Sequence, residues 1–258
     1  MVEESNPGKI KYKIFPTKEE ASKFVGDEIH CLITKNNENF QKTVFGLATG
    51  STPLPLYSYL HSLHKGHSLS FKNCITFNLD EYLPMSSTSE HSYAYFMKEN
   101  LISLIDLPGE NFNILSGEIE DTEESIEAHC REYKERISGE GGIDLQILGI
   151  GRSGHIGFNE PGSLIETSVR MVNLHSKTRE DAASSFGGIH NVPERALTMG
   201  VSDILKSKAI FIMAWGSAKA PIVKQAIYGD ISSHVTATFL QTHPNVCFIL
   251  DKDAASLL

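Results

Sequence analysis

Seven short apolar runs alternate with amphipathic helical segments along this chain of 258 residues. Such alternation favours a parallel sheet with helices on both faces, because a crossover between parallel strands needs a helix to return the chain. We therefore predict an α/β fold of the three-layer, Rossmann-like kind, with a mostly parallel central sheet, in a single domain spanning 1–258. The expected strands are 11–15, 43–48, 74–78, 111–115, 145–150, 209–214 and 246–250, and the expected helices are 18–35, 54–63, 92–105, 123–137, 203–206 and 218–228.

A histidine and a carboxylate follow the expected strand 145–150. The stretch from 149 to 160 reads Gly-Ile-Gly-Arg-Ser-Gly-His-Ile-Gly-Phe-Asn-Glu, and its glycines let the backbone turn tightly and approach a ligand. Ligands usually bind at the carboxyl edge of an open α/β sheet, where this stretch brings His155 and Glu160. A carboxylate that holds an imidazole in one tautomer serves proton transfer, so we predict a catalytic pair. A tight turn with a capping histidine is the alternative.

Two adjacent carboxylates, Asp80 and Glu81, follow the expected strand 74–78. Neighbouring acids repel each other, and burial would raise the pKa of one of them. A carboxylate with a raised pKa suits general-base work near neutral pH. The alternative is a solvated acidic turn, which is the commoner environment of an Asp-Glu pair.

A hydroxyl-rich loop joins the expected strand 43–48 to the expected helix 54–63. It contains Thr49, Gly50, Ser51 and Thr52, and Pro53 stands near the first helical turn. Unpaired amides at a helix N-terminus, with hydroxyls nearby, favour phosphate binding. The spacing matches neither a Walker A loop nor a dinucleotide fingerprint, and simple helix capping is the alternative.

The motifs together resemble the glucosamine-6-phosphate deaminase/isomerase family from about residue 14 to about residue 251. They follow the family's order and include Ala-Thr-Gly-Ser-Thr-Pro at 48–53, Thr-Phe-Asn-Leu-Asp-Glu-Tyr at 76–82, Ser-Tyr-Ala-Tyr-Phe-Met at 92–97, Gly-His-Ile-Gly-Phe-Asn-Glu-Pro at 154–161, Val-Pro-Glu-Arg-Ala-Leu-Thr-Met-Gly at 192–200, Gly-Ser-Ala-Lys at 216–219 and Leu-Gln-Thr-His-Pro at 240–244.

The resemblance implies an enzyme that converts glucosamine 6-phosphate and water into fructose 6-phosphate and ammonia, without a metal or an organic cofactor. It implies that Asp80 takes the proton from C2 and that His155, oriented by Glu160, assists ring opening. The residues expected to act in catalysis are Asp80, Ser153, His155 and Glu160, and those expected to bind the substrate are Thr49, Gly50, Ser51, Thr52, Glu81, Gly151, Arg152 and Lys219.

The chain departs from the family pattern at Ser153 and Ser184. The family usually has Asp or Asn at the first position and a substrate-binding arginine at the second. A serine hydroxyl can hydrogen bond to an imidazole but cannot supply a negative charge. Arg152 is a candidate for the missing substrate contact and, if it points inward, would lower the pKa of His155. Val172 replaces a lysine of the effector site that some members have, so we expect no strong activation by an acetylated amino-sugar phosphate.

Two further functions stay open beside the deaminase. Ser153 and Ser184 would fit an enzyme for another amino-sugar phosphate, such as galactosamine 6-phosphate. A sugar-phosphate sensor without turnover is the other alternative, and the presence of Asp80, His155 and Glu160 argues against it.

Composition limits the partners and the compartment. The net charge of −9 argues against general nucleic-acid binding, and the apolar runs are too short to cross a membrane. The N-terminal residues lack a signal-peptide pattern, and the four cysteines lack metal-ligand spacing, so we expect a cytoplasmic protein with reduced thiols. The expected partner is a small sugar phosphate, and a homo-oligomer is compatible with the resemblance. The span 159–190 is long and irregular, which favours an active-site lid.

Overall fold

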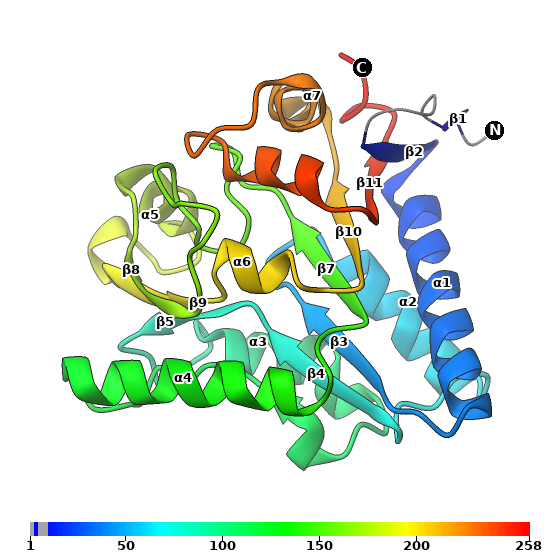
Figure 1. Cartoon of the computed structure of the whole chain (residues 1–258), viewed down its shortest axis with the longest axis horizontal. Coiled ribbons are helices and arrows are strands. Elements are labelled where there is room, and N and C mark those ends of the chain that lie inside the picture. The colour runs from blue at the N-terminus through cyan, green and yellow to red at the C-terminus, as the bar shows by residue number, and fades with distance from the viewer. Residues whose placement is uncertain (1–2, 5–9) are drawn as a thin grey trace.

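An eight-stranded sheet forms the middle layer of the computed structural model, which describes residues 3–4 and 10–258 (Figure 1). The strand order is β1-β2-β11-β10-β7-β3-β4-β6. Neighbouring strands are parallel except for β1 and β2, so the prediction of a mostly parallel sheet is confirmed. The strands are β1 (Glu3–Glu4), β2 (Lys11–Phe15), β3 (Thr43–Leu47), β4 (Cys74–Asn78), β6 (Phe112–Asn113), β7 (Leu145–Gly149), β10 (Ala209–Ala214) and β11 (Val246–Asp251).

Helices cover both faces of this sheet, which confirms the three-layer, single-domain architecture. On one face lie α1 (Lys18–Glu38), α2 (Leu54–Lys65) and α3 (Tyr93–Asn100), and on the other lie α4 (Glu123–Gly139), α6 (Val201–Ile204) and α7 (Ala220–Tyr228). Successive strand residues alternate between the two layers, as the pleat requires. Ile210 and Ile212 of β10 pack in one apolar cluster, whereas Met213 packs in the other.

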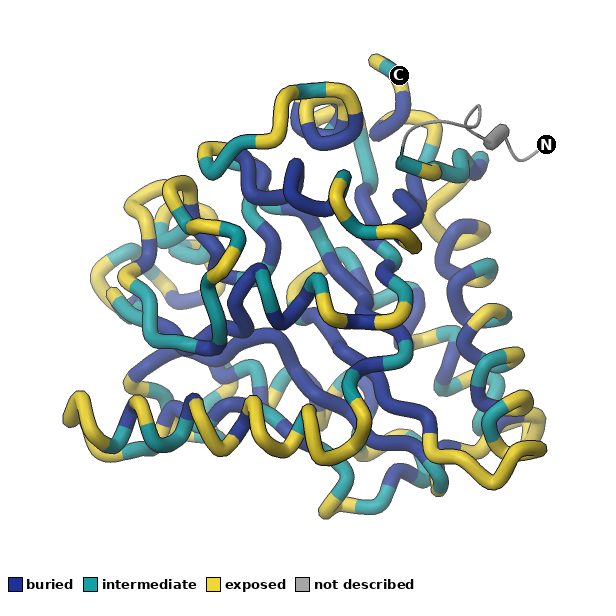
Figure 2. The backbone as a smooth tube through the Cα atoms, in the orientation of Figure 1, coloured by how far each residue is buried: buried dark blue, intermediate teal, exposed yellow. Residues whose placement is uncertain are grey.

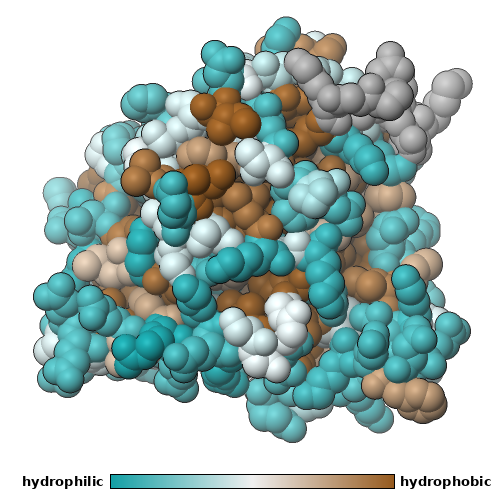
Figure 3. Space-filling model, viewed as in Figure 1, coloured by the Kyte–Doolittle hydropathy of each residue, from teal (hydrophilic) through white to brown (hydrophobic). Residues whose placement is uncertain are grey.

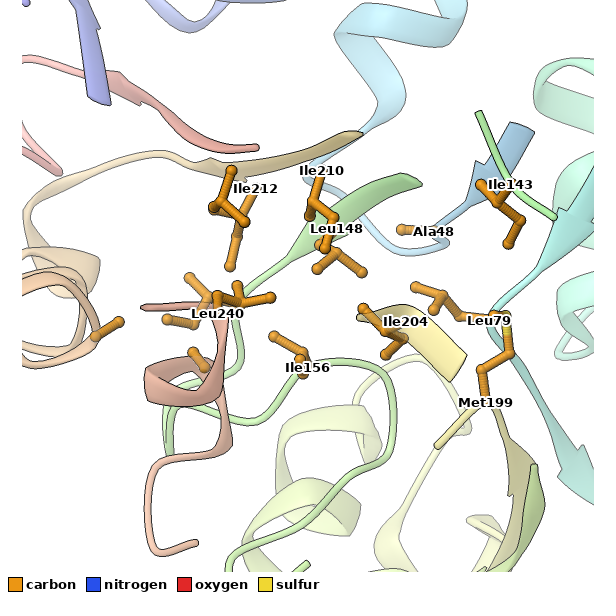
Figure 4. Packing of buried hydrophobic residues seen from close by; sticks show 14 of the residues in the cluster. Ala48, Leu79, Ile143, Leu148, Ile156, Met199, Ile204, Ile210, Ile212 and Leu240 are labelled. Atoms are coloured by element: carbon orange, nitrogen blue, oxygen red, sulfur yellow. The ribbon is translucent and has the colours of Figure 1, made fainter. Parts of the chain in front are cut away.

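The buried interior is continuous around the central strands (Figure 2). Figure 4 shows Ile210 and Ile212 beside Leu148 of β7, with Leu240 and Ile204 from the covering layer opposite them. At the surface, hydrophilic side chains predominate where α4 runs along the lower left of the view, and hydrophobic colour gathers nearer the centre (Figure 3). Among the described residues, no helix combines the length and the apolar character needed to cross a membrane.

A second, three-stranded antiparallel sheet was not expected from the sequence. Its order is β5-β9-β8, from β5 (Asp80–Leu83), β9 (Arg195–Thr198) and β8 (Arg170–Asn173). Only Leu79 separates β4 of the large sheet from β5 of the small one. The segment 159–190 is therefore less irregular than predicted, since it contains β8 and the helix α5 (Ser176–Ala182).

Several boundaries also differ from the expectation. The expected helix 92–105 ends as α3 at Asn100, because the backbone leaves the helical region at Leu101 (φ −148°). The expected strand 111–115 pairs over only two residues, Phe112 and Asn113. The short 3₁₀ turns are η1 (Ile102–Leu104), η2 (Gly109–Asn111), η3 (Ile189–Asn191), η4 (Ser217–Lys219) and η5 (Thr236–Thr242).

A crevice opens where the chain reverses its direction across the large sheet. From β3 the chain continues to β4 and β6 on one side, whereas from β7 it continues to β10 and β11 on the other. The loops after the neighbouring strands β3 and β7 therefore diverge, and such a switch point is where open α/β sheets bind ligands.

Candidate active site

The crevice between β3 and β7 holds a pocket of about 250 Å³. Most residues predicted for the site line it, although they come from three separate parts of the chain. The lining residues are Ala48, Thr49, Gly50, Ser51, Thr52, Leu79, Asp80, Tyr93, Gly149, Ile150, Gly151, His155, Gly157 and Phe158.

The loop after β3 forms one wall. Gly50 adopts φ +86°, a left-handed conformation that glycine reaches without strain. This turn places Thr49, Ser51 and Thr52 at the pocket, directly before α2 begins at Leu54. The hydroxyls and the amides of the first helical turn therefore lie where the sequence predicted a phosphate cradle.

Asp80 lies at the junction of the two sheets, and its side chain lines the pocket. Only 6% of the residue is exposed. Burial, and after it the charge of Glu81, raises the pKa of Asp80 to about 8. A Cβ at the facing residue, Gly157 (φ +55°), would lie 3.5 Å from the carboxylate oxygen Oδ2 and 3.0 Å from the Thr198 hydroxyl. A side chain at 157 would therefore crowd the Thr198 hydroxyl, and the positive φ also favours glycine at this position.

Glu81 has a different environment from the one we expected for a substrate ligand. It does not line the pocket, and its carboxylate accepts hydrogen bonds from the backbone N–H groups of Tyr82 (2.9 Å), Tyr93 (3.0 Å) and Ala94 (2.8 Å). The pKa of Glu81 is raised to about 7, because burial, which raises it, outweighs the three N–H donors, which lower it. The geometry makes Glu81 the cap of α3 and a source of negative charge beside Asp80.

The imidazole of His155 also lines the pocket, and its Nδ1 atom has two oxygen neighbours. The Ser153 hydroxyl lies 2.8 Å from Nδ1 and the Glu160 atom Oε2 lies 3.5 Å from it. Oε2 is buried and has no hydrogen-bond partner among the described residues, while Oε1 accepts from the His175 N–H at 3.3 Å. The structure thus brings the predicted His155, Ser153 and Glu160 together.

The electrostatic surroundings of His155 favour the neutral ring. Burial is the largest influence and lowers the pKa of His155, Glu160 raises it, Lys219 lowers it and Asp181 raises it. The neighbouring cation is therefore Lys219, not Arg152 as the sequence suggested.

The position of the His155 ring requires a glycine at residue 151. A Cβ at residue 151 would lie 2.2 Å from the Nε2 atom of His155. The turn is closed by hydrogen bonds from the Gly151 N–H to the His155 carbonyl and from the Gly154 N–H to the Gly151 carbonyl. Any side chain at 151 would displace the imidazole from the pocket.

The two predicted cationic residues have different neighbours. Lys219, in η4, donates from Nζ to the Ile150 carbonyl at 2.7 Å, at the wall of the pocket. Burial lowers the pKa of Lys219, the charge of Asp181 raises it and that of Arg152 lowers it. The Arg152 side chain does not line the pocket and donates to Asp181 of α5, with 3.0 Å between Nε and Oδ2.

Sequence reasoning missed Tyr93, Gly157, Phe158 and Asp181. Tyr93 and Phe158 line the pocket as stacked rings with 5.9 Å between their centroids. Tyr93 and Phe158 were plausible core residues, and Asp181 was one of many charged residues in the span 159–190. Only the resemblance of the segments around 93 and 158 to family motifs could have singled out the first three.

A larger groove of about 750 Å³ lies away from this crevice, between α4 and β8. It carries none of the predicted catalytic residues. Arg170, on its wall, donates to the Ser163 hydroxyl (3.0 Å) and to the Asn159 side-chain oxygen (2.9 Å), so its guanidinium is engaged within the chain.

Comparisons with known proteins show which family the chain is similar to. A family described as glucosamine-6-phosphate isomerases/6-phosphogluconolactonase matches residues 16–247. A glucosamine-6-phosphate deaminase of Thermoanaerobacter pseudethanolicus is 46% identical over 227 residues, covering 88% of each chain. One from Geobacillus sp. is 44% identical over 216 residues, covering 84% of each chain.

Solved structures show the same fold. A monomeric glucosamine-6-phosphate deaminase superposes with a TM-score of 0.89 at 38% identity, covering 95% of this chain and 98% of that chain. A 6-phosphogluconolactonase from Trypanosoma brucei superposes with a TM-score of 0.76 at 21% identity, covering 95% and 97%. At that identity the second likeness concerns the fold alone.

Proposed function

The chain belongs to the family of glucosamine-6-phosphate isomerases and 6-phosphogluconolactonases, and we propose that it is an enzyme that converts glucosamine 6-phosphate and water into fructose 6-phosphate and ammonia. The identity of 44–46% to curated deaminases over most of the chain supports this activity. The observation that carries it is the buried Asp80, which faces the same small pocket as the loop 49–52 and His155.

Asp80 is the general base of this proposal. With a pKa near 8, it can take a proton and return it near neutral pH. The proton that Asp80 removes from C2 of the open-chain sugar returns to C1, and the carbon bearing nitrogen becomes an imine. Water then adds at C2 and ammonia leaves.

His155 moves protons at the sugar oxygens. Its Nδ1 atom is engaged by Ser153 and Glu160, which leaves Nε2 for the substrate. A lowered pKa keeps the ring neutral, so it can take the proton from O1 and deliver one to the ring oxygen as the ring opens. Ser153 can accept or donate at Nδ1 because its hydroxyl rotates.

The phosphate is assigned to the loop after β3 and to Lys219. The residues Thr49, Gly50, Ser51 and Thr52 present hydroxyls and amides at the pocket. Lys219, whose Nζ donates to the carbonyl of the pocket residue Ile150, supplies the positive charge. The segment 159–190 covers the pocket as a lid in this proposal, and Gly151 keeps the imidazole in place.

Galactosamine 6-phosphate is the second candidate substrate. Ser184 lines a neighbouring cavity of about 520 Å³, which adjoins the catalytic pocket through Gly50, Ser51 and Tyr93. The absence of a large side chain at 184 would leave room for a sugar of different stereochemistry.

A substrate panel scored by ammonia release tests the proposal. Glucosamine 6-phosphate, galactosamine 6-phosphate, N-acetylglucosamine 6-phosphate and unphosphorylated glucosamine would be compared, with Asp80→Asn as the control. We expect the fastest release from glucosamine 6-phosphate and almost none in the variant. Tight sugar-phosphate binding without ammonia release from any of them would indicate the sensor instead.

We also propose that the protein resides in the cytoplasm. The thiols of Cys31, Cys74 and Cys130 are not in disulfides, which fits the reducing cytoplasm. A homo-oligomer stays a prediction, and mass photometry of the purified chain would test it.

A further inference from the structure

Helix α5 of the lid carries a carboxylate that is tied to the loop after β7. Asp181 accepts one hydrogen bond at Oδ2 from Nε of Arg152, at 3.0 Å, and another at Oδ1 from Nη2 of the same guanidinium. This side-on, bidentate arrangement fixes the plane of the guanidinium. The ion pair is partly open to solvent, with 59% of the Arg152 side chain and 33% of the Asp181 side chain exposed.

Asp181 of this ion pair lines a cavity together with part of the loop to which the phosphate is assigned. Asp181 lines the cavity of about 520 Å³ together with Gly50, Ser51 and Ser184. Gly50 and Ser51 also line the catalytic pocket, as does Gly151, the residue before Arg152. Asp181 therefore shares a cavity with the loop to which the phosphate is assigned, and it holds the guanidinium of the residue that follows Gly151.

The charges of this region act on the catalytic groups. Asp181 raises the pKa of both Lys219 and His155, and Arg152 lowers the pKa of Lys219. Arg152 and Asp181 thus both lie close enough to Lys219 for their charges to act on it. A guanidinium has five N–H groups, so the three that Asp181 does not use remain for an anion.

If the Arg152 guanidinium is already held in place before the substrate arrives, phosphate binding is favoured. A free arginine on an exposed loop loses much rotamer freedom when it grips a ligand, and a preformed contact reduces that cost. Ser184, which lines the same cavity from the lid, offers no charge to a phosphate.

Resting on the proposed function, we infer that Arg152 supplies the second cation that holds the substrate phosphate, and that Asp181 is the positioning residue that keeps its guanidinium at the phosphate loop. The lid helix takes part in substrate recognition through Asp181 and Arg152 together.

A double-mutant cycle tests this inference. Asp181→Asn, Arg152→Ala and the double variant would be compared by KM and kcat for glucosamine 6-phosphate and by calorimetric Kd for fructose 6-phosphate. We expect Asp181→Asn to raise KM and Kd about five- to tenfold, as befits the loss of a partly exposed, preorganising ion pair, with kcat changed by less than about twofold. Asp181→Glu should restore part of the affinity, and Asp181→Asn should have no further effect in the Arg152→Ala background.

A second bidentate ion pair provides the matched control. Arg195 donates two hydrogen bonds to Asp121 away from the pocket, and the two side chains are 29% and 53% exposed. Asp121→Asn should change neither KM nor Kd. The exchange Arg152→Asp with Asp181→Arg should regain affinity relative to Arg152→Ala, because it places the guanidinium on the lid beside the same loop.

The results separate this inference from the proposed function. If the parent protein releases ammonia but Asp181→Asn tightens or does not alter binding, the carboxylate does not position Arg152 and the inference fails. Equal losses for Asp181→Asn in the parent and in the Arg152→Ala background would also overturn it. If the parent releases no ammonia, the proposed activity fails, while the Kd series still decides the role of Asp181.

Discussion

The large and the small sheet contribute to one pocket in different ways. Strands β3 and β10 of the large sheet lie between two extensive apolar clusters. The loop 49–52 and His155 lie at the edge of this sheet and line the pocket. One face of the small sheet, including Leu83 and Leu197, packs in the first of these large clusters. The other face, including Tyr82 and Ala196, packs in a separate cluster of six buried residues, and the edge strand β8 is only partly buried. We infer that the large sheet holds the rigid groups, and that the small sheet and lid form a less stable part that can adapt to the substrate.

Asp80→Asn should have the largest effect, because Asp80 lies where the two sheets join. Loss of a general base should lower kcat by about 10²–10⁴-fold while sugar-phosphate binding persists. Steady-state kinetics together with calorimetry would measure both quantities. Turnover near the parent level would remove Asp80 from the mechanism.

The same substitution should stabilise the fold. The pKa of Asp80 is about 8 in the folded chain, against about 3.9 for an unfolded aspartate. Between these values the unfolded chain releases a proton that the folded chain keeps, so the parent loses stability as pH rises. The Tm of Asp80→Asn should therefore exceed the parent Tm increasingly from about pH 4 to about pH 8. A constant Tm difference would contradict the raised pKa.

Alanine substitution of two phenylalanines, Phe77 in the large sheet and Phe186 beside the small sheet, would compare the stability of the two regions. Phe77 of β4 is fully buried against Tyr133, with 5.6 Å between ring centroids, and Phe77→Ala should cost about 3–5 kcal/mol of global stability. Phe186, in the segment 159–190 that we propose as a lid, packs on Tyr82 of the small sheet and stacks on His91. Phe186→Ala should lower Tm less, but raise KM and speed amide hydrogen exchange over 176–191.

Chemical denaturation and exchange mass spectrometry would measure this pair. Equal losses of stability, without faster local exchange, would show that both sheets unfold as one unit.

Lys219→Ala should weaken binding of phosphorylated sugars by about 1.5–3 kcal/mol, the scale of a charge-assisted hydrogen bond. Unphosphorylated glucosamine serves as the matched ligand and should bind almost unchanged. A similar loss for both ligands would show that Lys219 acts by supporting the Ile150 loop, whose carbonyl it contacts.

Ser153→Asp should have the smallest effect. A carboxylate beside Nδ1 would stabilise the imidazolium and raise the pKa of His155. NMR titration of His155 would measure this shift. The acidic limb of kcat/KM should move little, because Asp80, with its pKa of about 8, protonates first as pH falls. An unchanged NMR titration would show that residue 153 does not tune the histidine.

Much of the fold was accessible from the sequence, since its strongest signals are local. The apolar runs at 145–150 and 209–214 became β7 and β10 because a strand buried on both faces is apolar throughout. The small sheet was not accessible, because the four-residue strands β5 and β9 carry no clear alternation and pair across more than a hundred residues.

For the site too, some features could be predicted from the sequence and others only from the tertiary structure. Residue types and spacing were enough to propose Asp80, His155 and the loop 49–52 as site residues, and these residues line one pocket because parallel strands bring their carboxyl ends to one edge. Side-chain partners were decided by the tertiary structure: Glu81 caps α3, Arg152 pairs with Asp181, and Lys219 is the cation beside His155. The physical reason is that backbone direction follows from local pattern, whereas the partner of a charged side chain depends on which distant segments fold against it.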